Sequence, residues 1–177
     1  LVEVMGAVAN ADFSSDLWGA RWSKLMVNCM ANALAGVSGY GTNEVRSELD
    51  PLRIGIQLGA EVARVALAEG ITLQKVLELP AESIIDAAEG RNIEEVEAAF
   101  IEAGKKGGAG GVPSFGQDVR KGRRNEIDYL NGYVSDLGKK LGVPTPFNDK
   151  IVEIVHDLGI DFKGEVKNIQ PLVDMLP

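Results

Sequence analysis

Three polar residues, Lys24, Asn28 and Asn32, interrupt an otherwise apolar segment that runs from Trp22 to Gly36. They are spaced four apart, and a step of four residues turns only about 40° around an α-helix, so they form one stripe roughly 12 Å long. A helix that is apolar on nearly all its other faces is a buried helix. The stripe can therefore either join neighbouring helices or line a polar cleft. Because a buried ammonium is costly unless it is paired, we expect a water-lined or substrate-lined cleft and an acidic partner for Lys24.

A second candidate group follows a glycine-rich loop. Ser114 is predicted to start a helix, where its hydroxyl and the free backbone N–H groups could hold an anion such as a carboxylate. An ordinary helix cap is the alternative role for this serine. Asp118, Glu126 and Asp128 follow it in the chain, and each could be the acidic partner of Lys24. Spacing alone does not choose between these three.

The composition and the remaining motifs disfavour several other kinds of site. The net charge of −8 and the pI near 4.7 argue against a general nucleic-acid surface, and the basic cluster 120–124 lies among acidic residues, as on a salt-bridged helix face. The single cysteine, Cys29, excludes an internal disulfide, and His156 has no partners at metal-ligand spacing, so we expect no metal site. The glycine run 104–111 lacks the strand–turn–helix context of a dinucleotide fingerprint and the Gly-Lys-Ser/Thr ending of a P-loop, so we expect a linker there.

The elements that must position these residues are all predicted to be helices. Apolar residues recur at helical spacing through most of the chain, and no segment alternates convincingly with period two. At 177 residues the chain fits one domain, so we expect an all-α, multi-helix bundle. The expected helical segments are 16–37, 44–50, 51–69, 73–79, 82–89, 93–103, 114–142 and 147–158, with the end of another helix before residue 10 and a loop at 104–112.

The ends of the sequence and its apolar runs give two further expectations. No run of 18 or more apolar residues and no signal-peptide pattern is present, so we expect a soluble, cytoplasmic protein. The chain begins at Leu1, in what reads as the middle of an element. We therefore expect it to be part of a longer protein.

The motifs that carry the candidate residues resemble one protein family when they are taken in order. They are KLMVNCMAN (24–32), SFGQDVR (114–120), EIDYLNG (126–132) and VPTPFN (143–148). Over most of residues 16–158 the chain resembles the C-terminal domain of ketopantoate reductases (2-dehydropantoate 2-reductases). The resemblance implies a bundle like the C-terminal domain of 6-phosphogluconate dehydrogenase, with residues 1–177 as one substrate-binding and dimerisation domain. The family's NADP-binding Rossmann domain precedes this one and is not in the sequence, so we expect the chain alone to be inactive.

The resemblance also implies a role for each candidate residue. Lys24 matches the catalytic lysine, which donates a proton to the keto oxygen as NADPH delivers hydride to the keto carbon. Asn28 and Asn32 match asparagines that bind the substrate and orient the lysine. Ser114 matches the serine that holds the substrate carboxylate, and Glu126 matches a glutamate coupled to the lysine and substrate. Reduction of a ketone builds negative charge on its oxygen, so a positioned ammonium suits the reaction.

The sequence departs from the family pattern at two asparagines. The family has one shortly after the stripe helix, where Asn43 is the nearest candidate here, and another just before the serine, where residues 110–113 contain none. We therefore expect a 2-keto acid reductase that most resembles the ketopantoate enzymes, with a related 2-keto or 2-hydroxy acid as an alternative substrate. A non-catalytic helical dimerisation module is the alternative from another class. We expect a homodimer, because the apolar helix faces exceed what a lone small bundle can cover, and no nucleic-acid or membrane partner.

Overall fold

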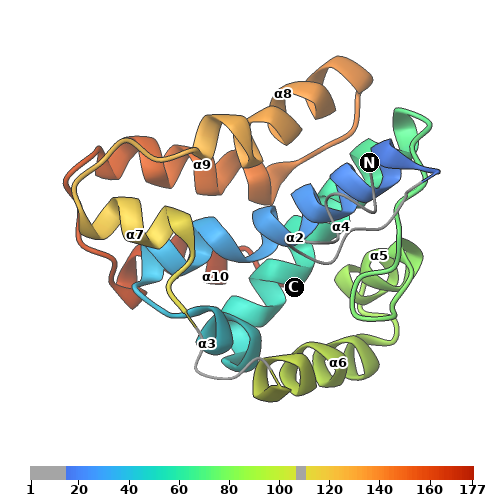
Figure 1. Ribbon diagram of the computed structural model, residues 1–177, viewed down its shortest axis with the longest axis horizontal. Coiled ribbons are helices and arrows are strands. Elements are labelled where there is room, and N and C mark those ends of the chain that lie inside the picture. The colour runs from blue at the N-terminus through green and yellow to red at the C-terminus, as the bar shows by residue number, and fades with distance from the viewer. Residues whose placement is uncertain (1–14, 107–110) are drawn as a thin grey trace, which may run out of the picture.

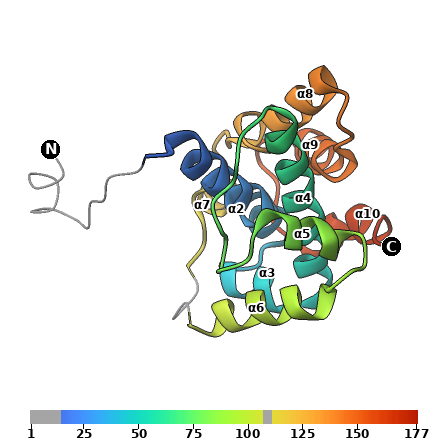
Figure 2. The same ribbon diagram turned by 90° about the vertical axis from the view of Figure 1, so that its right-hand side faces the viewer.

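The computed structural model describes residues 15–106 and 111–177, and in these ranges every regular element is a helix (Figure 1 and Figure 2). The predicted all-α class is confirmed for this part of the chain. None of the helices described is both long and apolar enough to cross a membrane. The predictions for residues 1–12 and for the middle of the glycine run lie outside the described residues. The elements are α2 (Leu17–Ser38), α3 (Thr42–Ser47), α4 (Leu49–Ala68), α5 (Ala81–Ala88), α6 (Ile93–Lys106), α7 (Ser114–Arg120), η1 (Ile127–Tyr129), α8 (Asn131–Leu141), α9 (Pro146–Leu158), η2 (Val166–Ile169) and α10 (Gln170–Val173).

The two longest helices, α2 and α4, pack against each other at the centre of the bundle (Figure 1). Helices α5 and α6 lie on one side of this pair, and α8 and α9 lie on the other (Figure 2). The first half of α2 buries Met26 and Met30 in a cluster with Phe100 of α6. Its second half buries Leu34 in a separate cluster with Phe115 of α7. Helix α2 therefore links two apolar cores, which fixes its position.

The ends of α2 follow from local sequence chemistry. Asp16 is the N-cap, and its side chain accepts a hydrogen bond from the Gly19 N–H at 2.8 Å. Gly39 ends the helix at φ 81°, and its N–H donates to the Ala35 carbonyl at 3.0 Å. A left-handed residue at this position favours glycine, which has no Cβ to clash. The predicted start near residue 16 and end near residue 37 are therefore confirmed.

The predicted helix 73–79 is wrong. Residues 71–75 form no regular element, and Val76 and Leu79 form an isolated bridge around a tight turn whose central residues, Leu77 and Glu78, have φ of 52° and 64°. The Ser23 hydroxyl of α2 accepts a hydrogen bond from the Gln74 N–H at 2.7 Å. This hydrogen bond satisfies a backbone N–H that would be paired within a helix, and it holds the segment against α2.

The long periodic stretch 114–142 is not one helix either. Helix α7 ends at Arg120, and the chain turns through Gly122 at φ 58° before η1 and α8 begin. The Arg123 N–H closes this turn by donating to the Asp118 carbonyl at 2.9 Å. Helix α6, in contrast, runs three residues into the predicted loop and ends at Lys106. Within the basic cluster 120–124, Arg120 is the last residue of α7, and residues 121–124 lie in the exposed turn that follows.

Glu61 is a buried carboxylate in the middle of α4, and it caps another helix. Its side chain is 3% exposed and accepts hydrogen bonds from the backbone N–H groups of Phe147 and Asn148, at 2.8 and 2.9 Å, at the start of α9. The Asn148 side-chain amide donates to the same carboxylate at 2.7 Å. Burial raises the pKa of Glu61 above its ordinary value of 4.5, although these three hydrogen bonds act in the opposite direction.

The raised pKa of Glu61 predicts how stability changes with pH. Because the folded state holds this proton more tightly than the unfolded state, the contribution of Glu61 is fully present below pH 4.5 and falls as the pH rises through the raised pKa. Urea unfolding of wild type and Glu61→Gln across this window should show the wild-type free energy of unfolding decreasing relative to the variant. Glu69→Gln, an exposed change at the end of the same helix, is the control. A wild-type free energy of unfolding that increases with pH relative to that of Glu61→Gln would contradict the raised pKa of Glu61.

Candidate functional site

The polar stripe of α2 lies on the outside of the bundle. Lys24 is exposed, and Asn28 and Asn32 are half-buried. Side chains that only join neighbouring helices would be buried and hydrogen-bonded to the backbone. The accessible surface of Lys24, Asn28 and Asn32 argues against that alternative. The two apolar cores take the other faces of α2 and leave this edge accessible.

Ser114 and Glu126 meet through the turn that follows α7. The Ser114 hydroxyl donates a hydrogen bond to Glu126 Oε1 at 3.1 Å. The N-cap of α7 is Pro113, and Ser114 is the first residue of the helix, so the predicted alternative of an ordinary serine cap does not apply. A continuous helix would not have brought these residues together, since twelve residues make about three and a third turns. The chain reversal creates a hydroxyl–carboxylate pair on an accessible surface.

Helix α7 packs against the end of the stripe helix at a glycine. Gly36 follows Asn32 by four residues and therefore continues the stripe by one turn. A Cβ at Gly36 would lie 2.3 Å from Cδ1 of Phe115, which shows how closely the Phe115 ring approaches the α2 backbone. Ser114 precedes Phe115 in the chain, so the hydroxyl–carboxylate pair lies beside the C-terminal end of the stripe.

A third segment, α3, closes the same region from the other side. The N–H and the hydroxyl of Thr42 both donate to the Gly111 carbonyl, at 3.2 and 3.0 Å. This contact holds the approach to Ser114 against the start of α3, where Asn43 is half-buried. Thr42, the residue before Asn43, thus contacts Gly111, which lies three residues before Ser114.

The expected acidic partner of Lys24 is not found within the described part of the chain. Glu126 is hydrogen-bonded to Ser114, and Asp128 lies 2.7 Å from His156 Nε2 and 3.8 Å from Arg124. Lys24 forms no ion pair with any acidic residue described, because its ammonium is exposed and water can solvate it. The site therefore presents the Lys24 ammonium, the amides of Asn28 and Asn32, and the Ser114–Glu126 pair on an accessible surface. Such a surface can hold a small anion and supply it with a proton.

Comparison with known proteins identifies similar sequences over most of the chain. The family model described as ketopantoate reductase PanE/ApbA C terminal matches residues 16–159. A 2-dehydropantoate 2-reductase from Streptococcus pyogenes serotype M3 is 30% identical over 162 residues, which cover 91% of this chain and 45% of that protein. The chain thus spans less than half the length of this curated relative.

Similar folds occur among solved structures. A ternary structure of D-mandelate dehydrogenase with NADH and anilino(oxo)acetate has 25% identity and a TM-score of 0.65, covering 98% of this chain and 59% of that one. A PanE/ApbA family ketopantoate reductase from Ralstonia eutropha has 24% identity and a TM-score of 0.61, covering 97% of this chain and 46% of that one. The second likeness is evidence for the fold alone.

The close contact at Gly36 predicts that a single methyl group displaces α7. In Gly36→Ala the Phe115 ring must move, and overpacking of this kind costs about 1–3 kcal/mol, partly offset by up to about 1 kcal/mol of helix propensity. Urea unfolding should therefore show a lower stability than wild type. Gly111→Ala is the control, because a Cβ there meets nothing within 4 Å. Equal stability of Gly36→Ala and Gly111→Ala would contradict the described packing of α7.

Proposed function

This chain belongs to the ketopantoate reductase PanE/ApbA family, whose C-terminal domain it forms, and from this premise we propose that it is the substrate-binding half of an NADPH-dependent reductase of 2-keto acids. The preferred substrate is 2-dehydropantoate, which the enzyme reduces to pantoate, a step of pantothenate biosynthesis. The described residues contain no strand–turn–helix unit of the kind that cradles a dinucleotide pyrophosphate. We assign the cofactor's phosphates to a nucleotide-binding half outside this chain.

The proposed chemistry divides between charge stabilisation and proton transfer. NADPH, when bound, supplies the hydride that adds to the keto carbon. The electron pair of the C=O bond then moves to oxygen, and the Lys24 ammonium donates the proton that completes the hydroxyl. Asn28 and Asn32 donate hydrogen bonds that hold the substrate along α2. Ser114 binds the carboxylate, and Glu126 positions Ser114 through their hydrogen bond. Lys24 is exposed and regains its proton from water after each turnover.

The observation that carries this proposal is that the Ser114–Glu126 pair and the polar stripe of α2, which are distant in sequence, lie close together. The Ser114–Glu126 hydrogen bond lies beside the end of the α2 stripe, and the stripe side chains are accessible. In a purely structural bundle we would expect polar groups at such a helix contact to be paired with one another. Here Lys24 has no acidic partner among the described residues and remains available to a ligand.

Loss of the ammonium should abolish turnover by the complete polypeptide that carries this chain. NADPH oxidation with ketopantoate, followed at 340 nm, should fall by about 100-fold or more in Lys24→Ala, since general acid catalysis contributes about 10²–10⁴-fold. Lys75→Ala, which removes an exposed lysine from the irregular segment 71–75, should retain wild-type turnover. Equal rates in wild type and Lys24→Ala would remove Lys24 from the mechanism.

A second candidate substrate class follows from the likeness to D-mandelate dehydrogenase. The alternative function is a dehydrogenase that interconverts a different 2-hydroxy acid and its 2-keto acid. The kcat/KM for ketopantoate and for phenylglyoxylate, the keto acid of mandelate, distinguishes the two, each measured with NADPH and with NADH. A higher kcat/KM for ketopantoate with NADPH is the expected result. A higher value for phenylglyoxylate would favour the alternative, and no turnover of either would favour the non-catalytic module.

We also propose that the complete protein is a homodimer. Large apolar side chains remain exposed at the start of α2, where Leu17 and Trp18 are 60% and 61% exposed. Burial of such side chains against a second copy would remove apolar surface from water. Light scattering should therefore give twice the monomer mass at micromolar concentration. A monomer at high micromolar concentration would contradict the dimer.

A further inference from the structure

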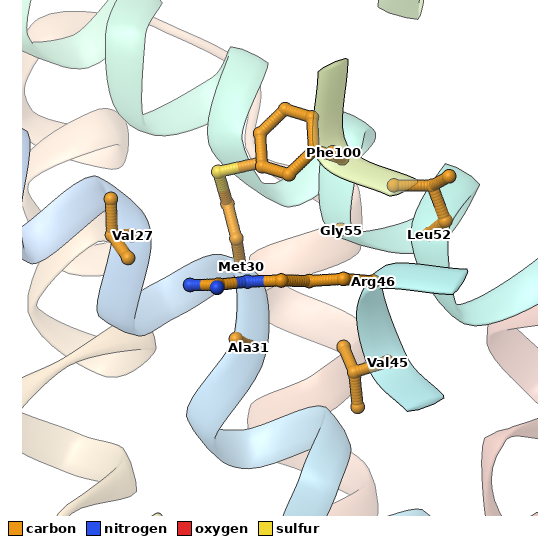
Figure 3. Close-up of a pocket in the computed structure, with 8 residues that line it drawn as sticks. All are labelled: Val27, Met30, Ala31, Val45, Arg46, Leu52, Gly55 and Phe100. Carbon is orange, nitrogen blue, oxygen red and sulfur yellow. The ribbon is translucent and has the colours of Figure 1, made fainter. Parts of the chain in front are cut away.

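An apolar hollow lies between α2, α3, α4 and α6 (Figure 3). Its lining consists of aliphatic, sulfur-containing and aromatic side chains together with one arginine. In Figure 3 the Met30 side chain extends from α2 toward Phe100 of α6, and the Arg46 side chain extends from α3 toward α2. The lining residues are Val27, Met30, Ala31, Val45, Arg46, Leu52, Gly55 and Phe100.

The hollow borders the polar stripe. Val27 precedes Asn28 directly, and Ala31 lies three residues after Asn28 on the same helix, so both flank the stripe on its α3 side. A ligand held by Asn28 and Asn32 would therefore have an apolar recess immediately beside it. None of the roles assigned to Lys24, Ser114 or to the asparagines uses this recess.

The size of the hollow limits what it can hold. Its volume is about 20 Å³, counted as space for the centres of water-sized spheres. One water needs about 10–15 Å³ on this measure, so a single methyl group fits and a phenyl ring does not unless the walls move. The walls are apolar, so a water there would lack hydrogen-bond partners and an apolar group would be favoured.

Arg46 is the one charged residue in this lining. The side chain is half-buried on α3, and no acidic residue described in the structure pairs with it. Its alkyl part can cover the recess while the guanidinium keeps its donors at the rim. A half-buried guanidinium without a carboxylate can donate hydrogen bonds to an oxygen-bearing ligand.

We propose that this hollow is the subsite for the substrate's side chain, with a methyl branch in the recess and a terminal oxygen at Arg46. This inference rests on the proposed function and adds to it the residues that select a substrate branched at carbon 3 and carrying oxygen on carbon 4. Ketopantoate, with two methyl groups on carbon 3 and a hydroxyl on carbon 4, has both features. Arg46 is thus a specificity-determining residue, distinct from the proton donor.

The experiment compares two substrates that differ in the terminal oxygen. Ketopantoate ends in a hydroxymethyl group, and 3,3-dimethyl-2-oxobutanoate has a methyl group in its place. In the complete polypeptide, Arg46→Met keeps an apolar cover but removes the donors, so kcat/KM for ketopantoate should fall about 10- to 100-fold, the range expected for one hydrogen bond to a charged group. The kcat/KM for 3,3-dimethyl-2-oxobutanoate should stay near the wild-type value. Arg64→Met, which removes an arginine of α4 paired with Glu89, is the matched control.

Two further variants keep the test independent of any folding defect in Arg46→Met. Arg46→Lys retains a donor at the rim and should recover part of the preference for ketopantoate. Val27→Ile adds one methyl group to the wall and should lower kcat/KM about tenfold for branched substrates while sparing unbranched 2-oxobutanoate. Far-UV circular dichroism checks the fold of each variant.

The outcomes separate this inference from the function on which it rests. Loss of terminal-oxygen discrimination in Arg46→Met and loss of branched-substrate preference in Val27→Ile would support the subsite. If wild type reduces ketopantoate but Arg46→Met lowers both keto acids equally, or neither, the subsite is wrong and the reductase proposal stands. If wild type reduces none of the three keto acids, the proposed function fails and the subsite fails with it.

Discussion

The arrangement of the bundle depends on a buried chain of hydrogen bonds that joins four helices. The carboxylate of Glu61 in α4 accepts from the Asn148 side chain of α9, whose Oδ1 accepts from the Asn131 amide of α8, and that amide also donates to the Cys29 carbonyl of α2. Each buried polar group left unpaired would cost about 1–3 kcal/mol, so the four helices hold one relative register. Cys29 is adjacent to Asn28, and the network therefore fixes the side of α2 that faces inward and leaves the polar stripe facing outward.

This constraint explains why spacing predicts a line of polar groups but does not decide between a line that joins helices and one on an accessible edge. Helical periodicity is a local property, so the alignment of Lys24, Asn28 and Asn32 follows from their spacing. Their exposure depends on which neighbours cover α2, and those neighbours come from α4, α7 and α9. The single carboxylate in the apolar run around Glu61 was the available signal for a buried polar network. Its partner Asn148 lies 87 residues away, and nothing local identifies it.

The same distinction holds for the other elements. The caps of α2 at Asp16 and Gly39 are encoded by adjacent residues, and both ends were predictable. Segment 73–79 has helical spacing, but its backbone bonds to Ser23, 51 residues earlier, so tertiary contacts override the pattern. The Ser114–Glu126 contact required a chain reversal that helical periodicity could not indicate. Arg46 belongs to no quoted motif, and only the packing of α3 against α2 brings it to the stripe.

In the proposed function, one face of α2, together with Ser114 and Glu126, binds a 2-keto acid for reduction. The most direct measurement is a crystal structure of the complete polypeptide with ketopantoate and oxidised cofactor. We expect the keto oxygen within hydrogen-bond distance, about 2.6–3.2 Å, of Lys24 Nζ, and the carboxylate at the same distance from Ser114 Oγ. Ketopantoate bound away from α2, with both side chains facing only solvent, would contradict it.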